Sequence, residues 1–150
     1  MQLQTKYNGE VQVKQEDILH FNQGLPSFEE ETEFILLPFA EGSPFLILQS
    51  TKTKELAFVL VNPFDFFQDY QVKIEDAVKE QLEINNRDEV MILVLLTLQE
   101  PFKKTTANLQ GPLIINVAKK LAKQVILNTS NYQTKHYLFP QQPSKVQEGK

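Results

Sequence analysis

Val90-Met-Ile-Leu-Val-Leu-Leu96 is the stretch that decides the fold, because it is apolar throughout and does not alternate with polar residues. A strand of this kind is covered on both faces, so we expect it in the middle of a core. The stretch Leu56–Val61 has the same character. Neither stretch approaches the roughly 18 to 20 apolar residues that span a bilayer, so no membrane association is expected.

Short runs rich in Val, Ile, Leu and Phe recur along the chain, separated by turn signals that contain Gly, Pro or Asn. The predicted strands are Gln2–Tyr7, Val11–Val13, Asp17–Phe21, Phe34–Phe39, Phe45–Gln49, Leu56–Val61, Tyr70–Ile74, Val90–Leu98, Leu113–Val117, Gln124–Leu127 and Gln133–Leu138. Asn8-Gly9 lies between the first two and predicts a hairpin, because both residues tolerate a positive φ.

Two short helical stretches are predicted. The helical spacing i, i+3, i+4, i+8 occurs at Ile74, Ala77, Val78 and Leu82. Glu75 and Asp76 lie in the first turn of this stretch, where the helix dipole favours acidic side chains. Ser27 has Glu30 three residues later, which is the pattern of a capping box and predicts a helical turn starting at Ser27.

Many short strands with one or two short helices predict a mainly β fold, a small antiparallel β-barrel-like single domain. The length of 150 residues fits one domain with one core. We assign the domain to residues 1–139. Residues 140–150 are polar and rich in Pro and Gln, and we expect them to form a disordered tail, because they cannot bury enough apolar surface to order themselves.

The composition offers little for catalysis. Cysteine is absent, which excludes disulfides, cysteine-ligated zinc and thiol nucleophiles. The two histidines, His20 and His136, have no neighbours that would complete a metal site, and no serine lies in a Gly-x-Ser-x-Gly motif. The five glycines form no phosphate-binding loop. We therefore expect no cofactor and no enzymatic activity and, in the absence of a signal peptide pattern, a cytoplasmic location.

The charge is distributed unevenly along the chain. Residues 1–100 contain 7 Lys or Arg and 18 Asp or Glu, a net charge of −11, whereas residues 101–150 contain 8 Lys and one Glu, a net charge of +7. If the strands of the two parts interleave, this is an ordinary solvated surface. If they do not, an acidic face would repel nucleic acid and suit a basic partner. The acidic balance disfavours direct binding to nucleic acid phosphates.

Aromatic residues crowd into the segment Asn62–Tyr70. Phe64 and Phe66 would share one side of an extended chain, while Phe67 would face the other. One side can enter the core, which leaves two readings for the other: further core packing, or an aromatic surface for a partner. Asp65 separates these rings where nucleic acid binding would require Lys or Arg.

Several phrases, taken in order, resemble the bacterial flagellar assembly factor family, FliW. They are Phe21-x-x-Gly24-Leu25-Pro26-x-Phe28-Glu29, Phe45-Leu46-x-Leu48-Gln49-Ser50, Phe58-x-x-x-Asn62-Pro63 with Tyr70, Thr106-Ala107-Asn108-Leu109-x-Gly111-Pro112-x-x-x-Asn116 and Gln124-x-Ile126-Leu127. The resemblance covers about Met1 to Leu138. One departure is Ser27, where the family usually has Gly.

The resemblance implies a β-barrel-like protein that is not an enzyme and that switches between partners. Members of the family bind flagellin in the cytoplasm and, when free, bind the translational repressor CsrA. Binding away from the RNA-contacting surface of CsrA antagonises it, so that translation of flagellin mRNA resumes. The chain would then be a monomer on its own, without direct nucleic acid binding. The alternative from a different class is a small-molecule-binding β-barrel or a hydrolase of unknown substrate.

We predict two sets of partner-binding residues from these observations. The first set lies in the segments Asn62–Tyr70 and Asn108–Asn116, whose family phrases are made of residues that packing alone does not demand. It consists of Asn62, Pro63, Phe64, Tyr70, Asn108 and Asn116. The second set is acidic and lies along the predicted helix, where it would repel RNA bound to CsrA. It consists of Glu75, Asp76, Glu80 and Glu83. For the Asn residues, loop structure is the alternative, since Asn side chains often bond to their own backbone.

Overall fold

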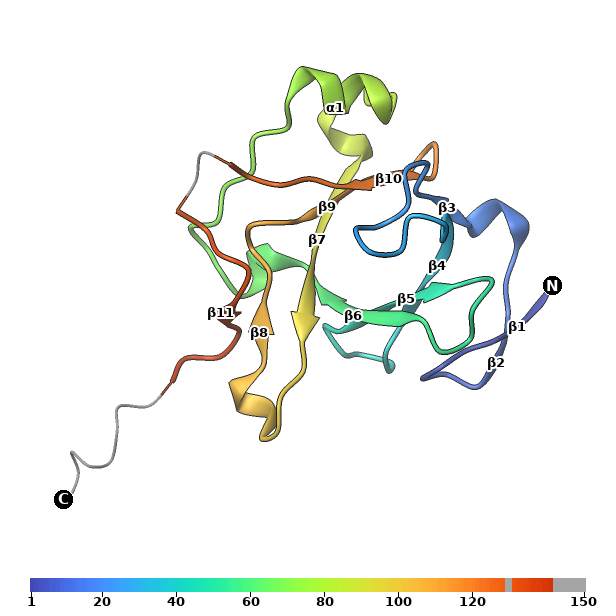
Figure 1. Cartoon of the computed structure of the whole chain (residues 1–150), viewed down its shortest axis with the longest axis horizontal. Coiled ribbons are helices and arrows are strands. Elements are labelled where there is room, and N and C mark those ends of the chain that lie inside the picture. The colour runs from blue at the N-terminus through green and yellow to red at the C-terminus, as the bar shows by residue number, and fades with distance from the viewer. Residues whose placement is uncertain (129–130, 142–150) are drawn as a thin grey trace.

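Seven strands close into a barrel in the computed structural model of the chain, which describes residues 1–128 and 131–141 (Figure 1). The order around the barrel is β7-β6-β5-β4-β3-β10-β9 and back to β7. The bounds are β3 Leu19–His20, β4 Glu33–Pro38, β5 Leu46–Ser50, β6 Ala57–Val61, β7 Val90–Thr97, β9 Leu113–Asn116 and β10 Leu121–Gln124. Neighbours are antiparallel except β3 and β10, which are parallel. The predicted mainly β, barrel-like fold is confirmed.

Strand β7 is the central element. One edge pairs with β6, and the other pairs first with β9 and then with β8 (Thr106–Ala107). Leu93 packs inside the barrel with Phe34 and Leu60, whereas Val94 faces a second core that contains Tyr70. Both faces of the strand are therefore covered, as the lack of alternation predicted.

A small second layer extends from the end of β7. β8 pairs with β7 on one side and with β11 (His136–Tyr137) on the other. Residues 108–112 leave the ladder between β8 and β9 and pass over the second core. The sequence does not predict β8, because two residues are too short to show any periodicity.

The predicted hairpin at Asn8-Gly9 is confirmed. Strands β1 (Gln2–Gln4) and β2 (Glu10–Gln12) pair antiparallel, and Gly9 takes a φ of +67° in the loop between them. Leu3 and Val13 pack against Ile35, so the hairpin covers the outside of β4. In Figure 1 it lies on the same side as the N-terminus.

The predicted helix over residues 74–82 is confirmed as α1 (Asp76–Gln81). Val78 and Leu82 are buried against Ile114 of β9, but Ala77 is exposed, so the buried face is narrower than the spacing predicts. Short 3₁₀ turns complete the described chain. They are η1 Gln15–Asp17, η2 Pro63–Asp65, η3 Arg87–Glu89 and η4 Phe102–Lys104. Among the described residues, no helix has the length and apolar character that crossing a membrane would require.

Three predictions about elements are wrong. Ser27 starts no helix, because its φ of +72° is left-handed and the chain makes two successive turns there. The segment Tyr70–Ile74 forms no strand, because the Tyr70 side chain is drawn into the second core. The last barrel strand is Leu121–Gln124 and not Gln124–Leu127, because the turn after Asn116 is short. The end of the predicted tail, residues 142–150, lies outside the described residues.

Candidate partner-binding surface

The predicted partner-binding residues form two adjoining groups. One surrounds η2 and the segment 108–112, and its members are Asn62, Pro63, Phe64, Tyr70 and Asn108. The other surrounds α1, and its members are Glu75, Asp76, Glu80, Glu83 and Asn116. The burial and contacts of each side chain separate those that a partner could touch from those that hold the backbone.

Within η2, Asn62 and Pro63 position Phe64. The Oδ1 atom of Asn62 accepts a hydrogen bond from the Phe64 N–H at 2.9 Å, which caps the turn. Pro63 is buried at the first position of the turn, where its fixed φ is favourable. Phe64 is left 41% exposed. Its ring centroid lies 5.7 Å from that of Tyr70, so Phe64 is the side chain that this turn offers to a partner.

Tyr70 and Asn108 hold segment 108–112 over the second core. Tyr70 is 4% exposed, and its Oη donates to the Leu109 carbonyl at 2.7 Å. Burial raises the pKa of the Tyr70 hydroxyl well above its ordinary value, with a smaller contribution from Tyr132. The Oδ1 atom of Asn108 accepts from the N–H groups of Gln110 and Gly111 at 3.1 and 2.9 Å. Both side chains act on this protein's own backbone.

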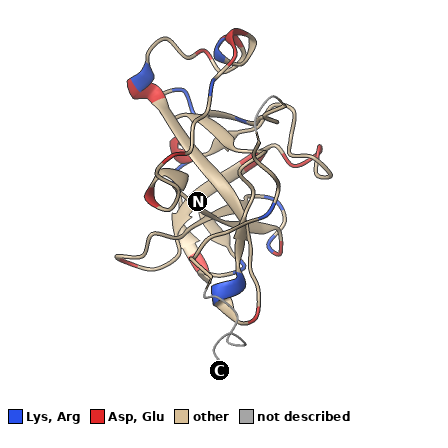
Figure 2. Ribbon diagram, turned by 90° about the vertical axis from the view of Figure 1, so that its left-hand side faces the viewer, with Lys and Arg blue, Asp and Glu red and all other residues tan. Residues whose placement is uncertain are grey.

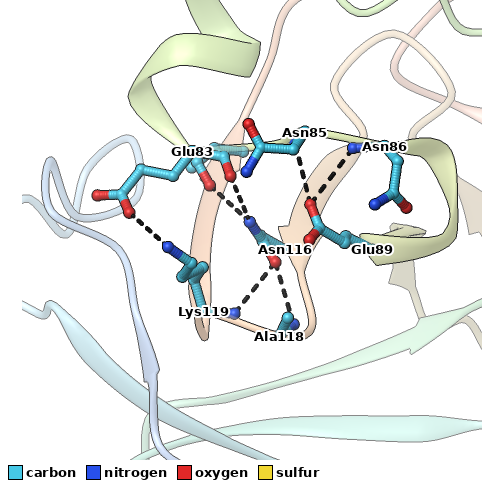
Figure 3. A network of polar contacts seen from close by, with 8 residues as sticks. Glu83, Asn85, Asn86, Glu89, Asn116, Ala118 and Lys119 are labelled. Atoms are coloured by element: carbon cyan, nitrogen blue, oxygen red, sulfur yellow. Dashed lines mark hydrogen bonds and ion pairs between the residues drawn. The ribbon is translucent and has the colours of Figure 1, made fainter.

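Asn116 fastens α1 to the barrel (Figure 3). Its Nδ2 donates to the carbonyls of Leu82 and Glu83 at 2.8 and 3.1 Å. Its Oδ1 accepts from the N–H groups of Ala118 and Lys119 at 3.0 and 3.1 Å. Asn116 is fully buried at 0% exposure, so it offers a partner no surface. Its place in the site is to set the position of α1.

The acidic residues of the α1 region differ in whether they are neutralised. Asp76 lies 3.9 Å from the Lys79 ammonium group, and Glu83 lies 3.2 Å from that of Lys119. Glu75 and Glu80 are exposed and have no ion pair within the described part of the chain. The negative charge that α1 presents to its surroundings therefore comes mainly from Glu75 and Glu80.

A groove of about 810 Å³ joins the two groups. Phe64 lines it together with Val90 and Ile92 of β7. Its charged lining residues are of both signs: Lys73, Glu75, Asp76, Lys79 and Arg87. Sequence reasoning missed this groove, because its lining comes from segments that are separated along the chain. The same is true of the Glu83–Lys119 pair, for which no local pattern gives a signal.

A groove lined by both apolar and charged side chains suits recognition of another protein chain. Within residues 1–128 and 131–141, no group of His, Asp or Glu is placed to hold a metal ion.

Comparison with known proteins gives the same family on three counts. The model of the FliW protein family matches residues 2–138. "Flagellar assembly factor FliW" of Geobacillus sp. (strain WCH70) is 50% identical over 145 residues, which cover 97% of this chain and 100% of that protein. The protein of the same name from Shouchella clausii (strain KSM-K16) is 53% identical over 135 residues, covering 90% of this chain and 92% of that protein.

Among solved structures, "Crystal structure of the flagellar assembly factor FliW" is similar with a TM-score of 0.91 at 47% identity. The match covers 95% of this chain and 100% of that chain. A family model that spans nearly the whole chain, together with relatives at about half identity, leaves one conclusion: this chain belongs to the FliW family, whose members are flagellar assembly factors and not enzymes.

Proposed function

We propose that the protein is a cytoplasmic flagellar assembly factor that binds flagellin and, when free, binds and antagonises the translational repressor CsrA. The observation that carries the proposal is the match to relatives named flagellar assembly factor over 97% of the chain at 50% identity. Release from flagellin would free the protein to capture CsrA, and translation of flagellin mRNA would resume. The groove beside α1 supports this proposal, because it offers both apolar and charged side chains to a protein partner.

The direct test is binding of the purified protein to purified flagellin and to purified CsrA, each measured by calorimetry. We expect a complex with each partner, and we expect added protein to release a flagellin leader RNA from CsrA. The RNA alone should not bind this protein at any salt concentration, since binding driven by phosphate contacts would appear at low salt. Absence of both protein complexes would overturn the proposal and favour a small-molecule-binding barrel.

The surface can be tested with Phe64→Ser. The expected result is about a tenfold loss of affinity for at least one partner, because a truncated aromatic anchor costs on the order of 1 to 2 kcal/mol. Phe28→Ser is the matched control, because Phe28 is similarly exposed at 39% and its ring packs against Phe58 instead. Equal losses in the two variants would remove Phe64 from the binding surface.

The buried members of the set require a different readout. Asn62→Ala and Tyr70→Ala should lower the free energy of unfolding, because each removes a hydrogen bond to the backbone. Partner affinity, measured per folded molecule, then distinguishes a positioning role from a structural one. If affinity per folded molecule is unchanged, these two residues belong to the scaffold and do not position the binding surface.

A further inference from the structure

Four phenylalanine rings meet at the end of the molecule opposite α1. Phe45 contacts Phe66 and Phe102 with centroid distances of 6.4 and 5.6 Å, and Phe139 contacts the same two rings at 6.2 and 5.5 Å. The four rings therefore form a closed cycle of contacts. They come from four separate segments: the start of β5, the end of η2, η4 and the residues after β11.

None of these rings is buried. Phe45, Phe66 and Phe139 are half-buried and pack against the second core on their inner side, and Phe102 is 44% exposed. Tyr137 on β11 is 51% exposed, and Leu98 at the end of β7 is 44% exposed. Strand pairing brings these two regions together, since Thr106 of β8 is opposite both Thr97 and Tyr137. Exposed apolar side chains gathered at one end of a molecule in this way are typical of a surface that another molecule covers.

Lysines accompany the exposed rings. Lys103 and Lys104 follow Phe102 in η4, and neither has an ion pair among the described residues. The Lys104 ammonium group lies 5.6 Å from the centre of the Tyr137 ring, which keeps it beside the apolar area. The same loop contains one acidic residue, Glu100, against these two lysines. In Figure 1 this yellow-to-orange loop lies opposite α1, and Figure 2 shows blue ribbon at the same end.

We infer that this phenylalanine–lysine surface, made of Leu98, Phe102, Lys103, Lys104, Tyr137 and Phe139, docks an acidic protein segment that carries an aromatic or apolar side chain between Asp or Glu residues. The rings would receive the apolar side chain, and the two lysines would pair with the flanking carboxylates. This site is distinct from the groove beside α1, and it stands independently of the proposed function.

Two other occupants fit less well. The chain's own residues after Phe139 begin beside this surface, where the Nε2 atom of Gln141 donates to the Lys103 carbonyl at 2.9 Å. Farther along the sequence, Lys145 and Lys150 against Glu148 give the wrong sign of charge for it. A second copy related by a two-fold axis would bring the same lysines of both copies into one interface. Like charges facing each other across an interface disfavour such a dimer. An acidic segment from a different protein satisfies both the apolar and the charged part of the surface.

The probe is a synthetic peptide, Asp-Glu-Phe-Asp-Leu-Glu-Asp, with a matched peptide in which Lys replaces each acid. Binding is followed by the backbone amide NMR signals of the isotopically labelled full chain. We expect the acidic peptide to shift signals in residues 98–105 and 137–139, with weaker binding as salt is raised. The double variant Lys103→Glu/Lys104→Glu should weaken this binding about tenfold. The double variant Lys52→Glu/Lys54→Glu, in the turn between β5 and β6, is the charge-matched control and should bind as the wild type does.

The remaining outcomes all count against the proposal. Equal binding of the acidic and the lysine peptide would leave an apolar surface with no preference for acidic partners. Shifts confined to the groove beside α1, or no shifts at all, would remove the docking site. Shifts in residues 98–105 that depend on protein concentration without any peptide would assign the surface to a second copy. Phe102→Ser keeps both lysines, so a full response in that variant would show that the rings take no part.

Discussion

At the scale of single residues, Ser27 is under backbone strain that its side chain does nothing to offset. Its φ of +72° is left-handed, and only its backbone N–H makes a hydrogen bond, to the Glu29 carboxylate at 3.3 Å. A left-handed conformation costs a non-glycine residue about 1 to 2 kcal/mol. The turn itself is fixed by Gly24, where a Cβ atom would lie 2.5 Å from the Glu29 backbone.

Ser27→Gly should therefore stabilise the protein. The relief of strain exceeds the extra entropy that glycine gives the unfolded chain, and we expect a net gain of about 0.5 to 1 kcal/mol in the free energy of unfolding. Urea denaturation measures it. Lys14→Gly is the control, because Lys14 is exposed with a φ of −101°, and this change should destabilise the protein. A loss of stability in Ser27→Gly would contradict the strain argument.

Glu31 ties the loop after Phe28 to the turn between β5 and β6. Its Oε1 and Oε2 accept hydrogen bonds from the hydroxyls of Ser50 and Thr53 at 2.6 and 2.7 Å. These two bonds hold the pKa of the Glu31 carboxyl below its ordinary value of 4.5. Above that pH the carboxylate is ionised in both the folded and the unfolded chain, so its contribution to stability is fully present. As the pH falls, the unfolded chain binds the proton first, and the contribution is lost through the lower pKa of the folded state.

Glu31→Gln should consequently cost about 0.5 to 1.5 kcal/mol at pH 7, discounted for a partly solvent-exposed group. The difference in the free energy of unfolding between this variant and the wild type should shrink when denaturation is repeated at pH 3. Glu30→Gln removes a neighbouring charge and serves as the control. A gap of unchanged size at pH 3 would show that the ionised carboxylate contributes nothing specific.

At the scale of elements, β7 connects the two cores. Leu93 is 1% exposed inside the barrel, and Val94 beside it belongs to the second core. Leu93→Ala should lower the free energy of unfolding by roughly 2 to 5 kcal/mol through lost burial and a residual cavity. Binding of every partner should fall together, in proportion to the unfolded fraction. Wild-type stability with only one partner lost would refute the assignment of Leu93 to the core.

Local signals decide which elements can be predicted from the sequence. β7 lacks alternation because both its faces are covered, and Asn8-Gly9 is followed by a strand, so both features appear in short windows. Ser27 and Glu30 match a capping box by spacing, but a left-handed φ at Ser27 overrides it. Tyr70 alternates with its neighbours like a strand residue, yet its hydroxyl is held by the Leu109 carbonyl, which is distant in sequence. Contacts of this range leave no trace in a local pattern.

The candidate site follows the same rule. The exposure of Phe64 and of the α1 acids follows from segments that the sequence singles out. The position of α1 does not, because it depends on Asn116, which reaches Leu82 and Glu83 from the far end of β9. The family phrases single out Asn116, but they do not tell whether its side chain contacts a partner or supports the backbone. Only its burial and its hydrogen bonds separate the two.

At the scale of the whole molecule, the uneven charge of the sequence is partly mixed and partly kept apart. Lys119 returns to α1 and pairs with Glu83, so the two parts of the chain do interleave there. Lys103 and Lys104 of η4 stay with the phenylalanine–lysine surface, at the end opposite α1 where Figure 2 shows blue ribbon. Glu75 and Glu80 therefore remain as the acidic groups of α1 that no lysine neutralises among the described residues. If α1 approaches RNA on CsrA, these two carboxylates are the source of any repulsion.

Repulsion between the α1 carboxylates and RNA should help to displace RNA from CsrA. Glu75→Gln/Glu80→Gln should reduce displacement about tenfold at low salt while leaving affinity for CsrA unchanged, because like charges across an interface can cost more than 1.4 kcal/mol. Asp76→Asn/Glu83→Gln is the matched control with a smaller effect, since lysines already offset those charges. Raising the salt should weaken the displacement of RNA by the wild type more than it weakens binding of the wild type to CsrA. The reason is that salt screens repulsion between exposed charges beyond the Debye length, which is about 8 Å at physiological salt. The decisive variant carries all four changes. If it binds CsrA normally and still displaces RNA fully at low salt, the antagonism is conformational and the charge of α1 is incidental to it.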